Sequence, residues 1–270
     1  MNLHFHKMNG AGNDFVVIDN RSLNHTLSTV QISKLCDRQR GVGADGLLAV
    51  EPAEKGADFK FRYYNADGGE AEMCGNGARC FGKYTASLLG EGTTQVSFET
   101  IAGTLGAEIL GDDVRIAMSD PFDLEMETPI SLDGLHHPVH SINTGVPHAV
   151  VFADDLENLD VIKHGAALRY HDHFSPNGTN ANFVSVTGDS HIAIRTYERG
   201  VEGETLACGT GMTACALIHN LLTGATSPVK VDVAGGETLE IGFEKSGEQT
   251  FKNVTLTGPA DFVFDGNITI

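Results

Sequence analysis

The stretch GEAEMCGNG at residues 69–77 is repeated in altered form as GETLACGTG at residues 203–211. In both stretches Gly and Glu stand five and four residues before a Cys, and Gly follows at the first and third positions after it. The two cysteines, Cys74 and Cys208, are 134 residues apart in a chain of 270. The string RYYN before the first stretch matches RTYE before the second at almost the same offset. This internal repeat predicts a duplicated unit with one equivalent thiol in each half.

A helix is expected to begin at each of these cysteines. The residues after Cys74 (GNGARCFGKYTASLLG) and after Cys208 (GTGMTACALIHNLLTG) are compatible with a helix, and both contain a Leu pair shortly before a Gly. Short strands without helices between them favour antiparallel sheets, so we predict an α+β fold with a sheet wrapped around one helix in each half. The expected strands after the two helices are residues 96–100, 105–110, 114–118, 229–233, 238–243 and 254–257.

The duplication also sets the expected domain boundaries. The first half covers residues 1–119 and the second covers residues 120–261, and whether residues 262–270 return to the first half stays open. The crossing is placed at Asp120-Pro121, because a residue before Pro is pushed toward extended geometry. A chain of 270 residues with 41% hydrophobic residues is long enough for two such domains.

The charge of the chain argues against several kinds of partner. With 18 Lys and Arg against 36 Asp and Glu, the formal net charge is −18, which repels nucleic acid and anionic membrane surfaces. The N-terminal segment has no export signal pattern, and no run of 18 apolar residues indicates a membrane span. We therefore expect a cytoplasmic protein with no nucleic-acid or membrane partner. Its five cysteines, an odd number without C-x-x-C spacing, are expected to be reduced.

A helix that begins at a cysteine favours thiolate chemistry. The first backbone N–H groups of a helix carry partial positive charge, so they stabilise a thiolate and also bind a carboxylate. Gly at the next position lets a ligand approach the backbone. Two such helix starts, with one sulfur on each face of an α-carbon, would invert a stereocentre by removing and returning a proton. This chemistry requires no metal and no pyridoxal cofactor.

The motifs resemble those of the diaminopimelate epimerase family over essentially the whole chain. KMNGAGNDFVVID, RGVGADGLL, YYNADGGEAEMCGNGARC, TGVPHAV, NGTNANF and YERGVEGETLACGTG occur in the family's order. The resemblance implies two pseudo-symmetric domains, each an antiparallel sheet or barrel around a central helix. It implies a cofactor-independent isomerase that interconverts LL- and meso-diaminopimelate in lysine and peptidoglycan precursor biosynthesis. Family members are commonly homodimers, and we expect the same here.

The resemblance also implies roles for individual residues. Cys74 and Cys208 match the catalytic acid and base pair. His148 and Glu198 match positions that adjust the acidity of the thiols. The positions that match substrate contacts, around the reacting carboxylate and at the distal amino acid head, are Asn13, Asn65, Gly75, Asn76, Asn180, Glu198, Arg199, Gly209 and Thr210.

Two positions depart from some family members. Gly46 stands where others carry Gln, and Val146 stands where others carry Asn, so no side-chain contact is carried over to either. Several matched residues also have simple structural alternatives: Asn13 and Asn65 suit turns, and His148 suits a hydrogen-bonded loop. Glu198 and Arg199 by themselves would suit a solvated ion pair.

Two other functions stay open from the residues. A proline racemase-like relative would also use paired cysteines, but that group usually has His two residues after its first catalytic Cys, where this chain has Asn76. A non-catalytic module could use the two helix starts to bind an anion or amino acid without turnover. Exchange of the α-hydrogen for deuterium separates these possibilities, because only a true substrate exchanges.

Two other motifs are set aside. Residues 41–46 satisfy G-x-G-x-x-G, but a polar segment precedes them and a strand-like LLAV follows, the reverse of a dinucleotide site. Scattered histidines lack the spacing of a metal site: His136, His137, His140, His171 and His173. The three other cysteines are expected to be buried apolar residues: Cys36, Cys80 and Cys215.

Overall fold

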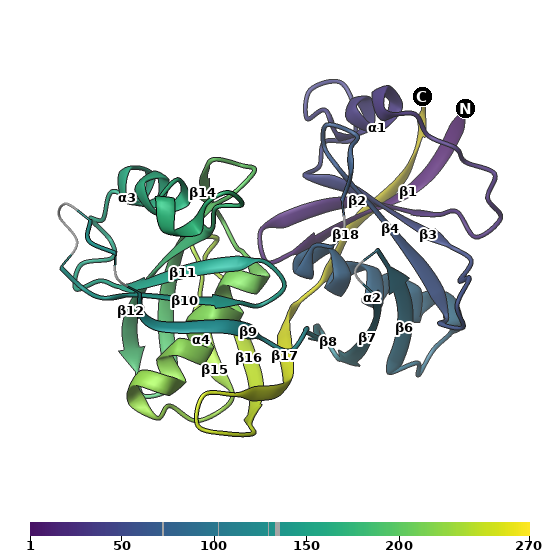
Figure 1. Ribbon diagram of the computed structural model, residues 1–270. Coiled ribbons are helices and arrows are strands. Elements are labelled where there is room, and N and C mark those ends of the chain that lie inside the picture. Colours follow the sequence, from purple (N-terminus) through teal and green to yellow (C-terminus); the bar gives the residue numbers. More distant parts are fainter. Residues whose placement is uncertain (72, 102, 129, 133–135) are drawn as a thin grey trace. The chain divides into compact units, whose positions relative to one another are not determined.

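In the computed structural model, residues 1–71, 73–101, 103–128, 130–132 and 136–270 are described (Figure 1). The chain divides into two compact units. Unit 1 comprises Met1–Ala117 together with Gly258–Ile270, and unit 2 comprises Met118–Thr257. Within the described residues, no helix is long and apolar enough to cross a membrane.

Among its described residues, unit 1 contains the helices α1 and α2, and its strands surround α2. The helix predicted to begin at Cys74 is confirmed as α2, Gly75–Leu89, and the three strands predicted after it are β6, β7 and β8. The other elements of the unit are β1 (Asn2–Gly10), β2 (Asn13–Asp19), α1 (Thr29–Cys36), β3 (Gly46–Glu51), β4 (Phe59–Asn65), β5 (Glu70–Ala71), β6 (Gln95–Thr100), β7 (Gly103–Leu110), β8 (Asp113–Ala117) and β18 (Asp261–Thr269).

Unit 2 repeats this order of elements. The helix predicted to begin at Cys208 is confirmed as α4, Gly209–Thr223, and the predicted strands after it are β15, β16 and β17. The other elements are β9 (Phe122–Thr128), β10 (Val139–Asn143), β11 (Pro147–Phe152), α3 (Val161–Arg169), the 3-10 turn η1 (Asp172–Phe174), β12 (Asn180–Gly188), β13 (His191–Glu198), β14 (Gly203–Thr205), β15 (Val229–Asp232), β16 (Thr238–Lys245) and β17 (Phe251–Pro259).

The α+β class is confirmed, with two additions to the predicted layout. Besides the antiparallel pairs, each unit has two parallel pairs at equivalent places: β2–β3 and β4–β6 in unit 1, and β11–β12 and β13–β15 in unit 2. A parallel pair needs a long crossover connection, and these connections contain the helices. Each unit therefore has a second helix, α1 or α3, in addition to the single helix that the sequence suggested.

The central helix of each unit, α2 in unit 1 and α4 in unit 2, is enclosed by the strands of that unit. Among the described residues, α2 contacts strands β1–β4 and β6–β8, and α4 contacts strands β10–β13, β15 and β16. Every residue from Gly211 to Asn220 is buried, as expected for a helix surrounded on all sides. Phe81 of α2 is fully buried against Phe61 and Phe98, with ring centroids 4.9 and 5.0 Å away. Truncating such a side chain typically costs about 3–5 kcal/mol.

The three cysteines predicted to be buried are buried. Burial raises the pKa of the Cys36 thiol to about 11 and that of Cys80 to about 12. Burial also raises the pKa of Cys215 well above its usual value. Because the thiolate is the reactive form, these surroundings make the three thiols inert at neutral pH.

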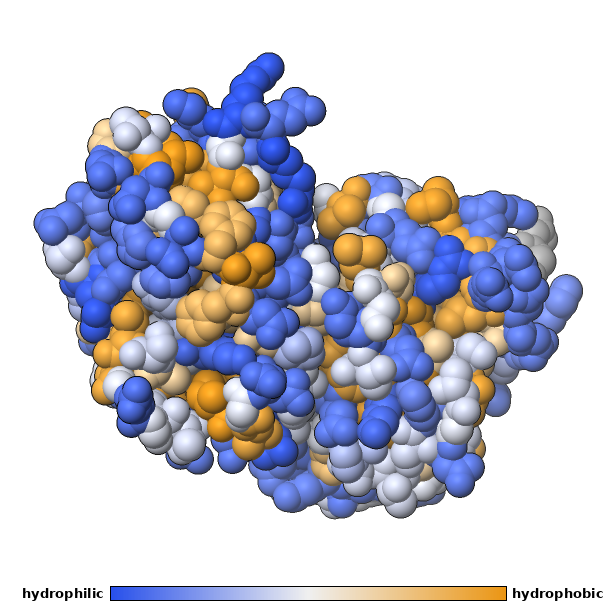
Figure 2. All heavy atoms as spheres, turned by 180° about the vertical axis from the view of Figure 1, so that it is seen from behind, coloured by the Kyte–Doolittle hydropathy of each residue, from blue (hydrophilic) through white to orange (hydrophobic). Residues whose placement is uncertain are grey.

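One strand of each unit is flanked by a strand from the segment that connects the repeats or ends the chain. Strand β9 pairs antiparallel with β10 in unit 2, and β18, the last strand of the chain, pairs antiparallel with β1 in unit 1. The two chain ends meet here, since the amino group of Met1 donates to the carbonyl of Ile270 at 2.7 Å. Among the described pairings, β1 is the partner of β18. The side chains of Phe262, Val263 and Phe264 on β18 are about half exposed. On the face drawn in Figure 2, hydrophobic residues form several orange patches among blue hydrophilic ones.

Candidate active site

Both candidate catalytic cysteines occupy the N-cap position of the central helix of their unit. Cys74 has an extended backbone (φ −137°, ψ 121°), and its sulfur accepts from the N–H of Gly77 at 3.5 Å. Cys208 has nearly the same backbone (φ −125°, ψ 109°), and its sulfur lies 3.6 Å from the hydroxyl of Thr210. The positive end of a helix therefore lies beside each sulfur, which favours the thiolate form.

In unit 1 two predicted site residues form a linked amide pair beside this helix start. Asn76, which is 1% exposed, donates from Nδ2 to Oδ1 of Asn13 at 2.5 Å. Asn13 is the first residue of β2 and not the turn itself. The turn is made by Ala11 and Gly12, whose φ values of 55° and 88° lie in the left-handed region. The Asn13 side chain is therefore not needed for the turn and contacts Asn76 instead.

Asn65 ends β4 on the same sheet. Its Oδ1 accepts from the hydroxyl of Tyr63 at 2.7 Å, and its main chain closes the turn to Gly69. Asn65 is paired in register with Gly46 of β3. A Cβ at position 46 would lie 2.6 Å from the carbonyl oxygen of Tyr64, so the local packing leaves no room for a side chain there.

In unit 2 the start of α4 is braced by threonines. Thr144, which is 1% exposed, donates to the carbonyl of Thr210 at 2.8 Å, and Thr213 donates to the carbonyl of Gly209 at 3.0 Å. These bonds fix the backbone whose N–H groups point out of the helix start. Val146 takes part through its main chain, where its carbonyl accepts from Thr144 N at 3.3 Å.

Asn180, Glu198 and Arg199 come together at the ends of β12 and β13. Asn180 Oδ1 accepts from the backbone N–H of Arg199 at 2.7 Å, and the Arg199 guanidinium donates to the carbonyl of Asn177 at 3.0 Å. Burial raises the pKa of the Glu198 carboxyl, and the Thr205 hydroxyl partly opposes this shift. Glu198 and Arg199 thus have distinct surroundings, unlike the solvated pair that their adjacency in sequence would suggest.

His148 is buried on β11, in register with Asn180 of the parallel strand β12. Burial lowers its pKa to about 3, with a further lowering from the charge of Arg199 and a small opposing effect of Asn182. Since an amide nitrogen only donates, Nδ1 of His148 accepts from Asn182 at 3.0 Å and the proton of the neutral ring sits on Nε2. His148 also lines a cavity of about 210 Å³ with Asn143 and Pro147.

Sequence reasoning missed Asn182, which is 0% exposed. Its amide donates to His148 and to the carbonyl of Ala149, and its Oδ1 accepts from Thr196 at 3.0 Å. A Cβ at Gly211 would lie 2.4 Å from that same Oδ1, so Asn182 occupies the space beside the first turn of α4. The available signal was the position of Asn182 inside the NGTNANF string.

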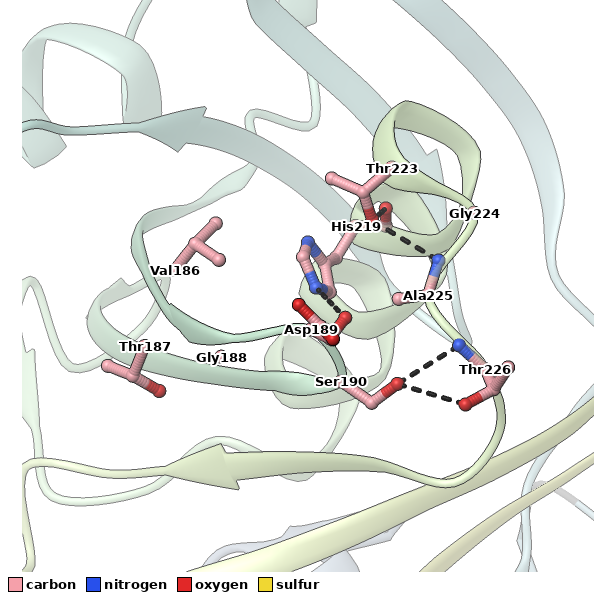
Figure 3. Close-up of a pocket in the computed structure, with 10 residues that line it drawn as sticks. All are labelled: Val186, Thr187, Gly188, Asp189, Ser190, His219, Thr223, Gly224, Ala225 and Thr226. Atoms are coloured by element: carbon pink, nitrogen blue, oxygen red, sulfur yellow. Dashed lines mark hydrogen bonds between the residues drawn. The ribbon is translucent and has the colours of Figure 1, made fainter.

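Another pocket of unit 2, larger than the cavity beside His148, has none of the predicted site residues among the described residues that line it. It has a volume of about 580 Å³ and lies between the β12–β13 turn and the C-terminal end of α4 (Figure 3). His219 and Asp189 line it, with a 3.2 Å contact between His219 Nε2 and the Asp189 carbonyl. A 15-residue helix is about 22 Å long, so this pocket lies far from Cys208 at the other end of α4.

The motifs that were set aside have other roles in the structure. Residues 41–46 connect the end of α1 to β3, so no helix follows the glycines. His137 contacts Asp154 at 2.9 Å and His173 contacts Glu125 at 3.1 Å. Within the described ranges, no three His, Cys, Asp or Glu side chains group in a way that could hold a metal ion.

The fold first places the chain in a structural class. It resembles a PhzF-family protein of Bacillus anthracis with a TM-score of 0.75 at 15% identity, covering 100% of both chains. It also resembles a hydroxyproline epimerase of Agrobacterium vitis with a TM-score of 0.70 at 17% identity, covering 99% of this chain and 91% of the other. The chain therefore shares its fold with this PhzF-family protein and this hydroxyproline epimerase.

Sequence similarity then identifies the family within this class. The diaminopimelate epimerase family model matches residues 5–122 and 140–263. A diaminopimelate epimerase of Aquifex aeolicus is 43% identical over 282 aligned residues, covering 99% of this chain and 98% of the relative. One of Chlorobaculum tepidum is 43% identical over 270 residues, covering 97% and 100%. The chain belongs to the diaminopimelate epimerase family of isomerases, as its motifs indicated.

Proposed function

We propose that Cys74 and Cys208 move the proton in the reaction of this family, the interconversion of LL- and meso-diaminopimelate. Family membership makes the chain an isomerase of lysine biosynthesis. The observation that carries the proposal is that each thiol is the N-cap of the central helix in its own repeat. Inversion of an α-carbon needs a base on one face and an acid on the other, and two equivalent thiols supply both.

In the proposed mechanism one cysteine acts as a thiolate and the other as a thiol. The thiolate removes the α-hydrogen as a proton and becomes a thiol, while the other thiol delivers its proton to the opposite face. The reverse reaction exchanges the two roles. The negative charge formed in between spreads onto the carboxylate, which N–H donors at Gly75, Asn76, Gly209 and Thr210 would bind. This scheme draws on no metal, pyridoxal or other cofactor.

The distal amino acid head of the substrate is assigned to polar residues beside these helix starts. Arg199 is suited to bind a carboxylate through its guanidinium fork, and Glu198 is suited to bind an ammonium group. Asn65 and Asn180 would contact the substrate through their side-chain amides. Asn13 would do the same beside Asn76, to which it is hydrogen-bonded. His148 and Glu198 are proposed to adjust the acidity of the thiols, with His148 acting as a neutral ring because its pKa is lowered to about 3.

The remaining expectations follow from the same assignment. We propose that the repeats 1–119 and 120–261 are the functional domains, with residues 262–270 added to the first. We also propose a homodimer, supported by the half-exposed apolar side chains of β18. Because the proposed substrate is a small molecule of lysine biosynthesis, we expect a cytoplasmic location. We also expect the product to serve as a peptidoglycan precursor.

The test is deuterium exchange at the α-carbon in heavy water. Wild type should exchange LL-diaminopimelate and should not exchange L-proline. Cys74→Ala and Cys208→Ala should each lose about 10²–10⁴-fold in epimerisation rate, the usual contribution of a general acid or base. Cys80→Ala is the matched control, because it removes a thiol from inside α2 that is fully buried.

Three results would contradict the proposal in different ways. Exchange of L-proline in place of diaminopimelate would favour the proline racemase-like reading. Tight binding of diaminopimelate without exchange in wild type would favour a non-catalytic binding module. An equal loss for Cys80→Ala and Cys74→Ala would show that the effect is structural.

A further inference from the structure

The amide pair Asn13–Asn76 is part of a longer hydrogen-bonded chain with a charged group at each end. Arg79 donates from Nη2 to Asn76 Oδ1 at 2.8 Å, and Asn13 donates from Nδ2 to Asp45 Oδ2 at 3.0 Å. With the 2.5 Å bond between the two amides, the order is Arg79, Asn76, Asn13, Asp45. All four residues belong to unit 1.

The charged ends determine which way each amide points. A guanidinium can only donate, so Asn76 must turn its oxygen toward Arg79 and its nitrogen toward Asn13. An ionised carboxylate can only accept, so Asn13 must turn its nitrogen toward Asp45 and its oxygen toward Asn76. The two requirements agree with each other. An amide pair without these ends could reverse both members and keep the bond between them.

The environments of the two ends suit this role. Arg79 is 0% exposed and also donates to the carbonyls of Pro259 at 3.2 Å and Gly75 at 3.5 Å, so it is fixed in place and shielded from substrate. Asp45 accepts from Arg38 at 2.8 Å on its other oxygen. Arg79 thus contacts Asn76, and Asp45 contacts Asn13, each through a side-chain hydrogen bond.

We propose that Arg79 and Asp45 are positioning residues that hold the amides of Asn76 and Asn13 with their N–H groups available to a carboxylate. Each Nδ2 carries a second hydrogen that the chain does not use. A carboxylate only accepts, so reversal of the pair would turn carbonyl oxygens toward it and repel it. This inference rests on the proposed binding of the substrate carboxylate at the start of α2, and it adds the side-chain N–H groups of Asn76 and Asn13 to the backbone donors proposed there.

The test compares single and double variants in two backgrounds. Gln at position 79 can either donate or accept, and Asn at position 45 can do the same, so Arg79→Gln and Asp45→Asn each remove one orienting end. Because the remaining end still orients the pair, each single variant should lower kcat/KM by no more than about tenfold. The double variant should lose more than the product of the two single losses, mainly through KM. In an Asn76→Ala background, the loss in kcat/KM of the double variant should equal the product of the two single losses.

Controls separate orientation from packing. Arg79→Lys keeps a charged donor, so the loss in kcat/KM for Arg79→Lys combined with Asp45→Asn should equal the product of the two single losses. Arg195→Gln removes an arginine that donates to the carbonyls of Leu156 and Leu159 in unit 2. Its loss in kcat/KM should also multiply with that of Asp45→Asn. Multiplicative losses for Arg79→Gln with Asp45→Asn while Asn76 is present would overturn the inference, and would leave the cysteine mechanism untouched.

A second measurement does not depend on turnover. The side-chain amide of Asn76, assigned by its absence in Asn76→Ala, should give a single set of NMR resonances in wild type and two sets in the Asp45→Asn/Arg79→Gln variant. A single unchanged set in that variant would also overturn the inference. If wild type showed no α-hydrogen exchange while the NMR result held, the proposed function would fail and the orienting chain would stand.

Discussion

Replacing His148 with Gln should remove a specific part of the acid sensitivity of this protein. The ring is 1% exposed, and burial lowers its pKa from 6.5 to about 3. The folded protein thus keeps His148 neutral, while the unfolded chain binds a proton as the pH falls below 6.5. Stability from this residue is fully present above pH 6.5 and is lost as the pH falls from 6.5 toward 3. Each pH unit in this window corresponds to about 1.4 kcal/mol, so about 2 kcal/mol is lost between pH 8 and pH 5.

Urea unfolding followed by circular dichroism at pH 5, 6, 7 and 8 measures this loss. Gln at position 148 can accept from Asn182 and does not titrate. The free energy of unfolding of wild type, relative to His148→Gln, should therefore fall by about 2 kcal/mol from pH 8 to pH 5. Other buried histidines contribute equally to both proteins and cancel in the difference. A difference that stays constant over this range would refute the reasoning, because it would mean that His148 titrates with the same pKa in the folded and the unfolded protein.

Three further predictions follow from single contacts. Gly211→Ala places a Cβ against Asn182 Oδ1 and should lower both the thermal midpoint and kcat/KM, whereas an unchanged enzyme would show that Asn182 can move away. Asp14 is partly buried, which raises the pKa of its carboxyl, but bonds from its two cationic partners lower that pKa to about 2 overall. Asp14→Asn should therefore lower the thermal midpoint at pH 7, and its difference from wild type should vanish as the pH falls from about 4 to about 2. Phe264→Asp on β18 should yield monomers in analytical ultracentrifugation, and a dimer of undiminished affinity would exclude β18 as the contact.

The parts of the fold that are coded locally could be predicted. Both central helices begin where the sequence indicated, because helix-compatible residues run from each Cys, which is the extended N-cap, to a Gly at the C-cap. The strands after them follow from alternating apolar residues and turn residues between them. The parallel pairs and the helices α1 and α3 were missed, because crossover connections depend on pairing between distant segments.

The same distinction holds for the site. Cys74, Cys208 and the glycines beside them stand out in a repeated string, so the sequence reveals them. Asp45 and Asn182 act through hydrogen bonds to Asn13 and His148, which are 32 and 34 positions away in the sequence, so the sequence near them does not identify these partners. Arg79 lies one helical turn from Asn76, but its link to Asn13 through Asn76 spans distant segments. Buried polar groups need partners in the folded chain, and only the structure identifies which ones they have.

The pairing of β18 with β1 ties the two ends of the chain to each other. On its other side β1 pairs with β2, so among the described pairings β18 completes the neighbours of β1 in unit 1. Without β18, the N–H and C=O groups of β1 that face it would lose their partners, and β1 would become an open edge. Loss of the last dozen residues should accordingly harm the opening strand of the chain first.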